Sequence, residues 1–320
     1  MTSSRIARAR GALLGFACGD ALGTTVEFHS RAAAQRRKDD AWPRDLVGGG
    51  PFRLLPGQVT DDTELMLALA RSIVRCGRYD EDDAARAYLR WFESGPFDCG
   101  MATRAAFGGF LDDAVPAAAV VAARASEDTQ ANGSLMRVLP IGVLGAALAR
   151  ERVAQWAMAD SRLSHPAEVT QWACATYAVT VADAIEHGLR GEELFERAWA
   201  FAKGSPMEET LVACHEGLPE SDAWSQGWVR IAMQHAYCHL LREAELESAL
   251  VETVLCGGDT DTNAAVVGGL LGAVRGVDAI PARWREAVVG CRSPRPAEYQ
   301  CGDLLEVADG LFAAGKGLRE

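Results

Sequence analysis

Two pairs of acidic residues stand at the beginning of apolar segments that are far apart in the chain. In the run QVTDDTELMLALA, Asp61 and Asp62 lie between Thr60 and Thr63. The apolar residues that follow recur at helical spacing, so the run predicts a capped helix start, where side-chain oxygens accept hydrogen bonds from free N–H groups. Carboxylates there also oppose the positive end of the helix dipole. Alone, this first pair indicates capping rather than metal binding or catalysis.

The second pair is Asp259 and Asp261, which Thr262 follows in the run CGGDTDTNAAVVGG. It also opens an apolar segment, and capping alone explains it equally well. Carboxylate and hydroxyl oxygens are, however, the ligands that hard cations such as Mg²⁺ and Mn²⁺ prefer. A metal centre therefore requires that the two pairs lie close together in the fold.

A glycine pattern at both ends of the chain predicts that they do. The segments GALLGFACGDAL at 11–22 and GGLLGAVRGVDAI at 268–280 carry glycines at the same offsets. Each glycine destabilises a helix interior by about 1 kcal/mol, so their repetition favours two helices that pack closely. The first helix leads toward one acidic pair and the second follows the other, so four carboxylates would converge. Their pKa values would rise unless cations were bound, and we expect two divalent cations, Mg²⁺ or Mn²⁺.

The composition predicts a single all-α domain over residues 1–320. Of the 320 residues 49% are hydrophobic, and apolar residues recur at helical spacing at 83–93, 169–187, 227–242 and 245–255, whereas strand patterns are scarce. The net charge of −12 argues against a nucleic-acid-binding surface. Neither a secretory signal nor an apolar run of about 18 residues is visible, so we expect a cytoplasmic protein without a transmembrane segment.

The cysteines and histidines do not form a recognisable site. Nine cysteines are scattered without a C-x-x-C motif, which indicates that most of them are small buried residues in a reducing compartment. His235 and His239 are one helical turn apart, as two metal ligands on a helix can be, but the glutamate of H-E-x-x-H is missing. We therefore interpret both as core or surface histidines.

Six segments resemble those of the ADP-ribosylglycohydrolase family and occur in the same order: GDALGTTVEF, GGGPFRLLPGQVTDDTELMLALARS, SGPFDCG, NGSLMR, LSHP and GGDTDTNAAVVGGLLGAVRGVDAIP. The resemblance extends from about Gly11 to about Trp284. It implies a compact multi-helix fold with a central binuclear magnesium or manganese centre. It also implies a hydrolase that removes ADP-ribose from a modified protein side chain, which in the most similar members is arginine.

The resemblance assigns the metal ligands to the two acidic runs, at Thr60, Asp61, Asp62, Asp259, Asp261 and Thr262. It makes Asp61 and Asp261 the candidates that bridge both ions. Glu27 matches a glutamate that lies near the metals and can gate the site, and Asp98 matches an aspartate at the substrate ribose. Because a protonated guanidine leaves more easily, a carboxyl group should act as general acid, with Asp98 the first candidate and Glu27 the second.

The resemblance places substrate contacts at Met101, Ala102, Thr103, Asn132, Gly133, Ser134, His165 and Trp228. Residues 132–134 match a glycine-rich loop that receives phosphate, and His165 matches a histidine near the diphosphate and ribose. Three positions depart from the family pattern: Ala131 replaces a glycine, Met101 replaces a polar residue, and Trp228 replaces a tyrosine that stacks on the ligand. We expect these changes to alter substrate preference rather than to abolish catalysis.

Structural interpretations of the same residues remain open. Glu27 can be a surface acid, Asp98 a loop acid or helix cap, and His165 the end of a helix before a proline. Asn132-Gly133 is also a common turn dipeptide.

Other functions are open as well. They are hydrolysis of serine-linked or small-molecule ADP-ribose, and a non-catalytic ADP-ribose-binding or structural role. A phosphatase that uses Asp259-x-Asp261 is disfavoured because no buried strand precedes the motif. The expected partners are an ADP-ribosylated protein substrate and, from the resemblance, a regulatory signalling protein, and we expect a monomer.

Overall fold

The computed structural model describes residues 2–37, 42–109, 115–219 and 225–318, and within these ranges the regular structure is helical. The α-helices are α1 Thr2–Gly23, α2 Arg31–Arg36, α3 Asp61–Cys76, α4 Glu81–Glu93, α5 Met101–Phe107, α6 Ala117–Ala122, α7 Leu139–Leu144, α8 Arg150–Arg162, α9 Glu168–His187, α10 Gly191–Ala202, α11 Glu208–Ala213, α12 Val229–Leu241, α13 Leu246–Val254, α14 Thr260–Arg275, α15 Ala282–Gly290 and α16 Leu304–Gly317. The 3-10 helices are η1 Thr24–Val26, η2 Asn132–Arg137, η3 Gly145–Ala147, η4 Val277–Ala279 and η5 Ala297–Tyr299. The all-α prediction is confirmed.

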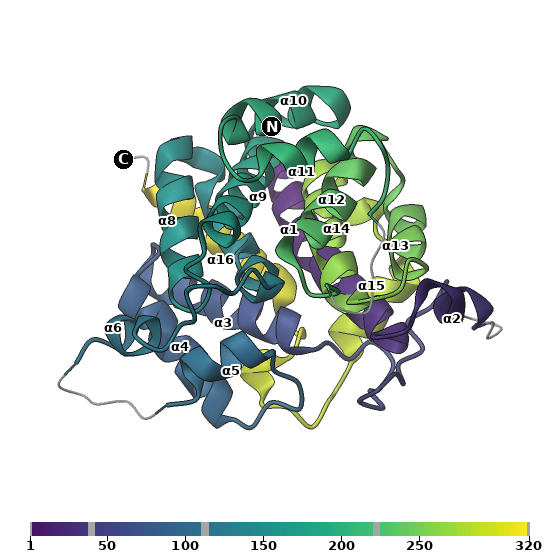
Figure 1. The fold of residues 1–320 in the computed structure, drawn as a ribbon, viewed down its shortest axis with the longest axis horizontal. Coiled ribbons are helices and arrows are strands. Elements are labelled where there is room, and N and C mark those ends of the chain that lie inside the picture. Colours follow the sequence, from purple (N-terminus) through teal and green to yellow (C-terminus); the bar gives the residue numbers. More distant parts are fainter. Residues whose placement is uncertain (1, 38–41, 110–114, 220–224, 319–320) are drawn as a thin grey trace.

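The two glycine-rich helices, α1 and α14, pack antiparallel through the centre of the molecule (Figure 1). A Cβ atom added to Gly15 would lie 2.3 Å from the carbonyl oxygen of Gly268, and one added to Gly19 would lie 2.1 Å from that of Ala264. Any side chain at these positions would push the helices apart. The predicted contact between the two ends of the chain is confirmed.

The end of the second glycine helix differs from the prediction. The repeated segment reaches Ile280, but α14 ends at Arg275 because Gly276 has a φ of 82°, which a right-handed helix does not accommodate. The matching glycine of the first copy, Gly19, lies inside α1. The first two glycines of the spacing therefore pack at the contact between the two helices in both copies, whereas the third lies inside the helix in one copy and ends it in the other.

The other helices enclose this central pair. α9, α12 and α13 pack on α14, while α16 packs on α1 and α3 (Figure 1). α3 begins at Asp61 as predicted, with the Thr60 hydroxyl accepting a hydrogen bond from the Asp62 N–H at 3.4 Å. The helices predicted around 83–93, 169–187, 227–242 and 245–255 are α4, α9, α12 and α13.

The cysteine and histidine predictions agree with the structure. All nine cysteines are free thiols, and six of them are buried, whereas Cys99 and Cys291 are half-buried and Cys76 is exposed. His235 and His239 are buried in the core, and His239 Nε2 lies 3.0 Å from the Thr253 hydroxyl. Neither belongs to a group of metal-ligating side chains among the residues described. Within the same ranges, none of the helices combines the length and the apolar character that crossing a membrane requires.

Candidate metal centre and substrate pocket

The two acidic helix starts meet beside the end of α1. The Thr260 hydroxyl donates a hydrogen bond to the Gly23 carbonyl at 2.7 Å, which seats the start of α14 on the last turn of α1. The Thr262 hydroxyl then donates to Asp62 Oδ1 at 3.2 Å, across from α14 to α3. These contacts bring both acidic pairs into one cluster.

The cluster contains two groups of three carboxylates that could each hold a cation. One group is Asp20, Asp62 and Asp261, the other is Glu27, Asp259 and Asp261, and the oxygens within each group lie within 4.8 Å of one another. Asp261 belongs to both groups, as the predicted bridging role requires. Asp61, the other predicted bridging residue, belongs to neither group but lines the adjoining pocket.

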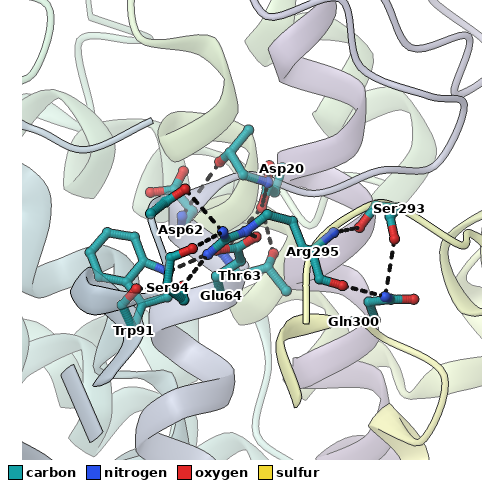
Figure 2. A network of polar contacts seen from close by, with 11 residues as sticks. Asp20, Asp62, Thr63, Glu64, Trp91, Ser94, Ser293, Arg295 and Gln300 are labelled. Carbon is teal, nitrogen blue, oxygen red and sulfur yellow. Dashed lines mark hydrogen bonds and ion pairs between the residues drawn. The ribbon is translucent and has the colours of Figure 1, made fainter. Parts of the chain in front are cut away.

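Asp20 is a member of this cluster that the sequence analysis missed. It lies on α1, is fully buried, and accepts hydrogen bonds from the Thr60 N–H at 3.1 Å and the Thr63 hydroxyl at 2.5 Å (Figure 2). Its carboxylate therefore holds the first turn of α3 in place. The signal in the sequence was a single acidic residue inside the apolar, glycine-rich run GALLGFACGDAL.

The start of α14 is not capped in the way that the start of α3 is. Asp259 occupies the N-cap position of α14, but its side chain makes no capping hydrogen bond. Instead, Asp259 Oδ2 accepts a hydrogen bond from Asn132 Nδ2 at 2.7 Å. Capping therefore accounts for Thr60 but not for the carboxylate of Asp259.

Glu27 is held against the cluster by paired turns. The Phe28 N–H donates to the Gly258 carbonyl at 2.9 Å, and the Gly258 N–H donates to the His29 carbonyl at 2.8 Å. Phe28 adopts a φ of 64° there and exposes 58% of its surface at the pocket. Glu27 itself is only 4% exposed, so its interpretation as a surface acid is wrong.

Burial gives five carboxylates at this site, those of Asp20, Glu27, Asp61, Asp62 and Asp261, pKa values above their ordinary range. Burial and the nearby Asp98 raise the pKa of Glu27 to about 9, and burial raises that of Asp20 to about 6. Burial together with neighbouring carboxylates also raises the pKa of Asp61, Asp62 and Asp261 well above the usual value. Within the described residues Glu27 Oε2 and Asp62 Oδ2 have no hydrogen-bond partner. Oxygen atoms that are buried, unpaired and mutually repulsive fit divalent cations.

A pocket opens onto the cluster and contains most of the predicted substrate residues. We call the lining residues Glu27, Asp61, Asp62, Asp259 and Asp261 the acidic wall. We call the uncharged lining residues Thr103, Asn132, Gly133 and His165 the neutral wall. Asp98, Met101, Ala102 and Thr262 complete the predicted residues that line the pocket.

Asp98 lies in the loop between α4 and α5, beside Asp61. Burial raises the pKa of its carboxyl above the ordinary range, although a hydrogen bond from the Cys99 N–H opposes this shift. A raised pKa helps a carboxyl group to hold the proton that a general acid donates. Met101, at the start of α5, is 90% exposed at the mouth of the pocket.

The neutral wall depends on the absence of a side chain at Gly133. A Cβ atom there would lie 2.8 Å from His165 Cε1 and 2.9 Å from the Thr103 hydroxyl. Asn132 next to it is fixed through its N–H, which donates to the Gly227 carbonyl at 2.9 Å. The dipeptide is therefore the start of the 3-10 helix η2, packed against two other segments, rather than an isolated turn.

Hydrogen bonds determine which nitrogen of His165 carries the proton. Arg137 Nη1 donates to the Ser164 hydroxyl at 2.7 Å, and that hydroxyl lies 2.8 Å from His165 Nδ1. The Ser164 hydrogen is then directed to Nδ1, so the proton resides on Nε2, the nitrogen next to Gly133. Burial and the charge of Arg137 lower the pKa of His165 to about 3. His165 is thus a neutral hydrogen-bond donor at the pocket.

Two predicted substrate residues direct their side chains elsewhere. The Ser134 hydroxyl is buried 2.9 Å from that of Ser161. Trp228 is 40% exposed, donates through Nε1 to Gln130 Oε1 at 3.0 Å, and lines a neighbouring pocket. Its backbone pairs with Ala131, so it lies close to the neutral wall without lining it.

Comparison with known proteins indicates the family to which this chain belongs. The chain is 34% identical over 282 residues to the ADP-ribosyl-[dinitrogen reductase] glycohydrolase of Rhodospirillum rubrum, with 87% of this chain and 88% of that protein covered. It is 32% identical over 323 residues to the ADP-ribosylarginine hydrolase Tri1 of Pseudomonas putida, with 98% and 82% covered. A solved structure described as an ADP-ribosylglycohydrolase-related protein complex superimposes with a TM-score of 0.77 at 28% identity, covering 98% of this chain and 99% of the other.

The family model for ADP-ribosylglycohydrolases matches residues 1–319, which is nearly the whole chain. This match includes both acidic runs and all residues that line the pocket. This protein belongs to the ADP-ribosylglycohydrolase family.

Proposed function

We propose that this enzyme hydrolyses the N-glycosidic bond between ADP-ribose and an arginine side chain of a modified protein. The observation that supports this most directly is the convergence of two acidic helix starts in one pocket, whose remaining lining residues apart from Asp98 are uncharged. Two relatives whose names specify arginine or a dinitrogen reductase target favour the arginine linkage over serine.

The acidic wall would hold two divalent cations, Mg²⁺ or Mn²⁺. Asp20, Asp62 and Asp261 form one group of ligand atoms, and Glu27, Asp259 and Asp261 form the other. Thr60, Asp61 and Thr262 lie at the same helix starts and are further ligand candidates. When bound, such cations neutralise the carboxylates, orient sugar hydroxyls and lower the pKa of a bound water.

The other polar residues of the pocket would handle the substrate. Cleavage of a ribosyl bond develops positive charge on the sugar, and the leaving guanidine must gain a proton. Asp98 is our candidate for that proton because burial raises its pKa and because it lies beside the acidic wall. His165 Nε2–H and Asn132 would bind ribose or diphosphate oxygens from the neutral wall.

The test is the release of ADP-ribose from an arginine-modified peptide, measured together with metal content. We expect two bound cations per chain, and release that stops when EDTA removes them. A serine-modified peptide of the same sequence is the matched control and is expected to stay intact. Release from the serine peptide alone would overturn the arginine linkage. Failure to cleave either peptide with both metals bound would overturn a protein side chain as the target.

A further inference from the structure

Arg295 lies outside the pocket, yet it binds two segments that carry pocket residues (Figure 2). One is the first turn of α3, where Glu64 follows Asp62 by two positions. The other is the turn formed by Ser94 and Gly95 at the end of α4, and Gly95 precedes Asp98 by three residues. The Arg295 side chain is 8% exposed and that of Glu64 is 1% exposed, so water does not compete for these contacts.

Each of the five N–H groups of the Arg295 guanidinium has an acceptor. Nε and Nη2 donate to the two carboxylate oxygens of Glu64, at 2.8 Å and 2.9 Å. Nη2 also donates to the Ser94 hydroxyl at 2.7 Å, and Nη1 donates to the carbonyls of Ser94 and Gly95 at 3.1 Å and 3.2 Å. Three of the five donors therefore bind the turn rather than the carboxylate.

The partners of Arg295 are themselves fixed. Trp91 Nε1 donates to Glu64 Oε2 at 2.7 Å, which ties the carboxylate to α4. On the other side, Gln300 Nε2 donates to the Arg295 carbonyl at 2.6 Å and to that of Ser293 at 3.2 Å. The guanidinium is thus a rigid connection between α3, the end of α4 and the 293–300 segment (Figure 2).

We propose that Arg295 is a positioning residue that fixes the loop carrying Asp98 relative to the carboxylates of α3. An ion pair with a purely structural role needs only the carboxylate of Glu64. Here the planar guanidinium of Arg295 also binds the carbonyls of Ser94 and Gly95, which begin the loop that carries Asp98. Lysine cannot replace this geometry because its ammonium group has three donors and no fixed plane. The inference rests on the proposed role of Asp98 as general acid.

The test combines Arg295→Lys with Asp98→Asn in a double-mutant cycle. Arg295→Lys is expected to lower kcat by about 10- to 100-fold, since small displacements of a reacting group have effects of this size. It should leave the metal content unchanged and increase deuterium uptake in the peptide that spans 94–100. In the Asp98→Asn background, Arg295→Lys is expected to lower kcat less than about twofold, because both changes disable the same group.

Several outcomes would overturn the proposal. Unchanged deuterium uptake at 94–100 in Arg295→Lys shows that Arg295 does not hold the loop, whatever the substrate of the enzyme. If the double variant loses kcat by the product of the two single effects, Arg295 does not act through Asp98. The same follows if Arg295→Lys lowers kcat although Asp98→Asn alone does not. An inactive parent enzyme would instead contradict the proposed function, while the exchange experiment still decides whether the loop is held.

Two further variants keep the experiment interpretable. Ser94→Ala removes only the contact between Arg295 and the Ser94 hydroxyl, so it should lower kcat by about 2- to 10-fold and increase deuterium uptake at 94–100. This variant tests the proposal even if Arg295→Lys fails to fold. Arg150→Lys is the matched control, because Arg150 makes a bidentate pair with Asp183 at 3.2 Å and 2.6 Å outside the pocket. It should leave kcat and the exchange of residues 94–100 at the parent values.

Discussion

The acidic wall and the neutral wall of the pocket differ in whether their polar side chains have hydrogen-bond partners. In the neutral wall, Asn132 donates to Asp259 of the acidic wall and His165 is hydrogen-bonded to Ser164, so both side chains have a fixed orientation. In the acidic wall, Glu27 and Asp62 each retain an oxygen without a partner among the described residues, and burial raises the pKa of both groups. The side chains of the neutral wall therefore find their hydrogen-bond partners within the protein, whereas the acidic wall keeps buried carboxylate oxygens that a bound cation would satisfy.

The largest effect that would test this contrast is expected from Asp261→Ala. Asp261 belongs to both groups of candidate ligands, so its loss should abolish turnover and metal binding. The metal-free variant should unfold at a higher temperature than the metal-free parent, because one of several repelling buried carboxylates is gone. Metal analysis, activity and thermal unfolding check this. Asp278→Ala, at an exposed acid in η4, is the control, and full activity with two metals bound in Asp261→Ala would contradict the assignment.

Asp98→Asn separates proton transfer from metal binding. The amide preserves the shape of the side chain but cannot donate the proton to a leaving guanidine. General acids contribute roughly 10²- to 10⁴-fold, so kcat should fall by about that factor while metal content and ADP-ribose affinity stay near the parent values. Rapid-mix kinetics and calorimetry provide the measurements. If kcat is unchanged, Glu27→Gln becomes the variant to measure next.

The dependence of stability on pH should differ between the two walls. The pKa of Glu27 is raised from 4.5 to about 9, so the folded metal-free protein binds a proton that the unfolded chain releases, and stability falls as the pH rises through this interval. The pKa of His165 is lowered from 6.5 to about 3, so below pH 6.5 the unfolded chain binds a proton that the folded protein does not. The stability that His165 contributes is therefore lost as the pH falls from 6.5 toward 3.

Thermal unfolding between pH 7.5 and 9 reports on the acidic wall with little contribution from His165, because that histidine is largely neutral there in both the folded and the unfolded state. With EDTA, we expect the stability to fall by about 1.4 kcal/mol per pH unit for a group such as Glu27. With saturating Mn²⁺ this slope should disappear, because a bound cation keeps the carboxylates ionised. Identical slopes with and without Mn²⁺ would show that the acidic wall does not bind metal.

The smallest expected effect belongs to the neutral wall. Ser164→Ala removes the donor that holds the proton of His165 on Nε2, so nitrogen-15 shifts of His165 should report a mixture of tautomers. The affinity for ADP-ribose should fall by about 2- to 10-fold, the value of one hydrogen bond. Ser72→Ala, a buried hydrogen-bonded serine outside the pocket, is the control. A single Nε2–H tautomer in Ser164→Ala would show that Ser164 does not set it.

The features that sequence reasoning predicted depend on local patterns. Thr60 is recognisable as a cap from its neighbours, and the glycine spacing of α1 and α14 is by itself a sign of close helix packing. Asp20 was missed because its neighbours are apolar and its partners come from α3. The Arg295–Glu64 pair joins residues 231 positions apart, and a lone arginine in a loop carries no sign of its partner. Likewise, the direction of the Ser134 and Trp228 side chains is decided by the tertiary packing.

The contact between α1 and α14 also determines when the enzyme can first become active during its own synthesis. Thr260 and Gly23, whose hydrogen bond joins these helices, are 237 residues apart. At roughly 5–20 residues per second, a ribosome needs about 10 to 50 s to make the intervening chain. Throughout that interval the bare glycine face of α1 has no α14 to cover it, and the ligand group that includes Asp20 lacks Asp261. We therefore expect a nascent or truncated chain that ends before α14 to be inactive, and activity to begin only after α14 has been made and has packed on α1.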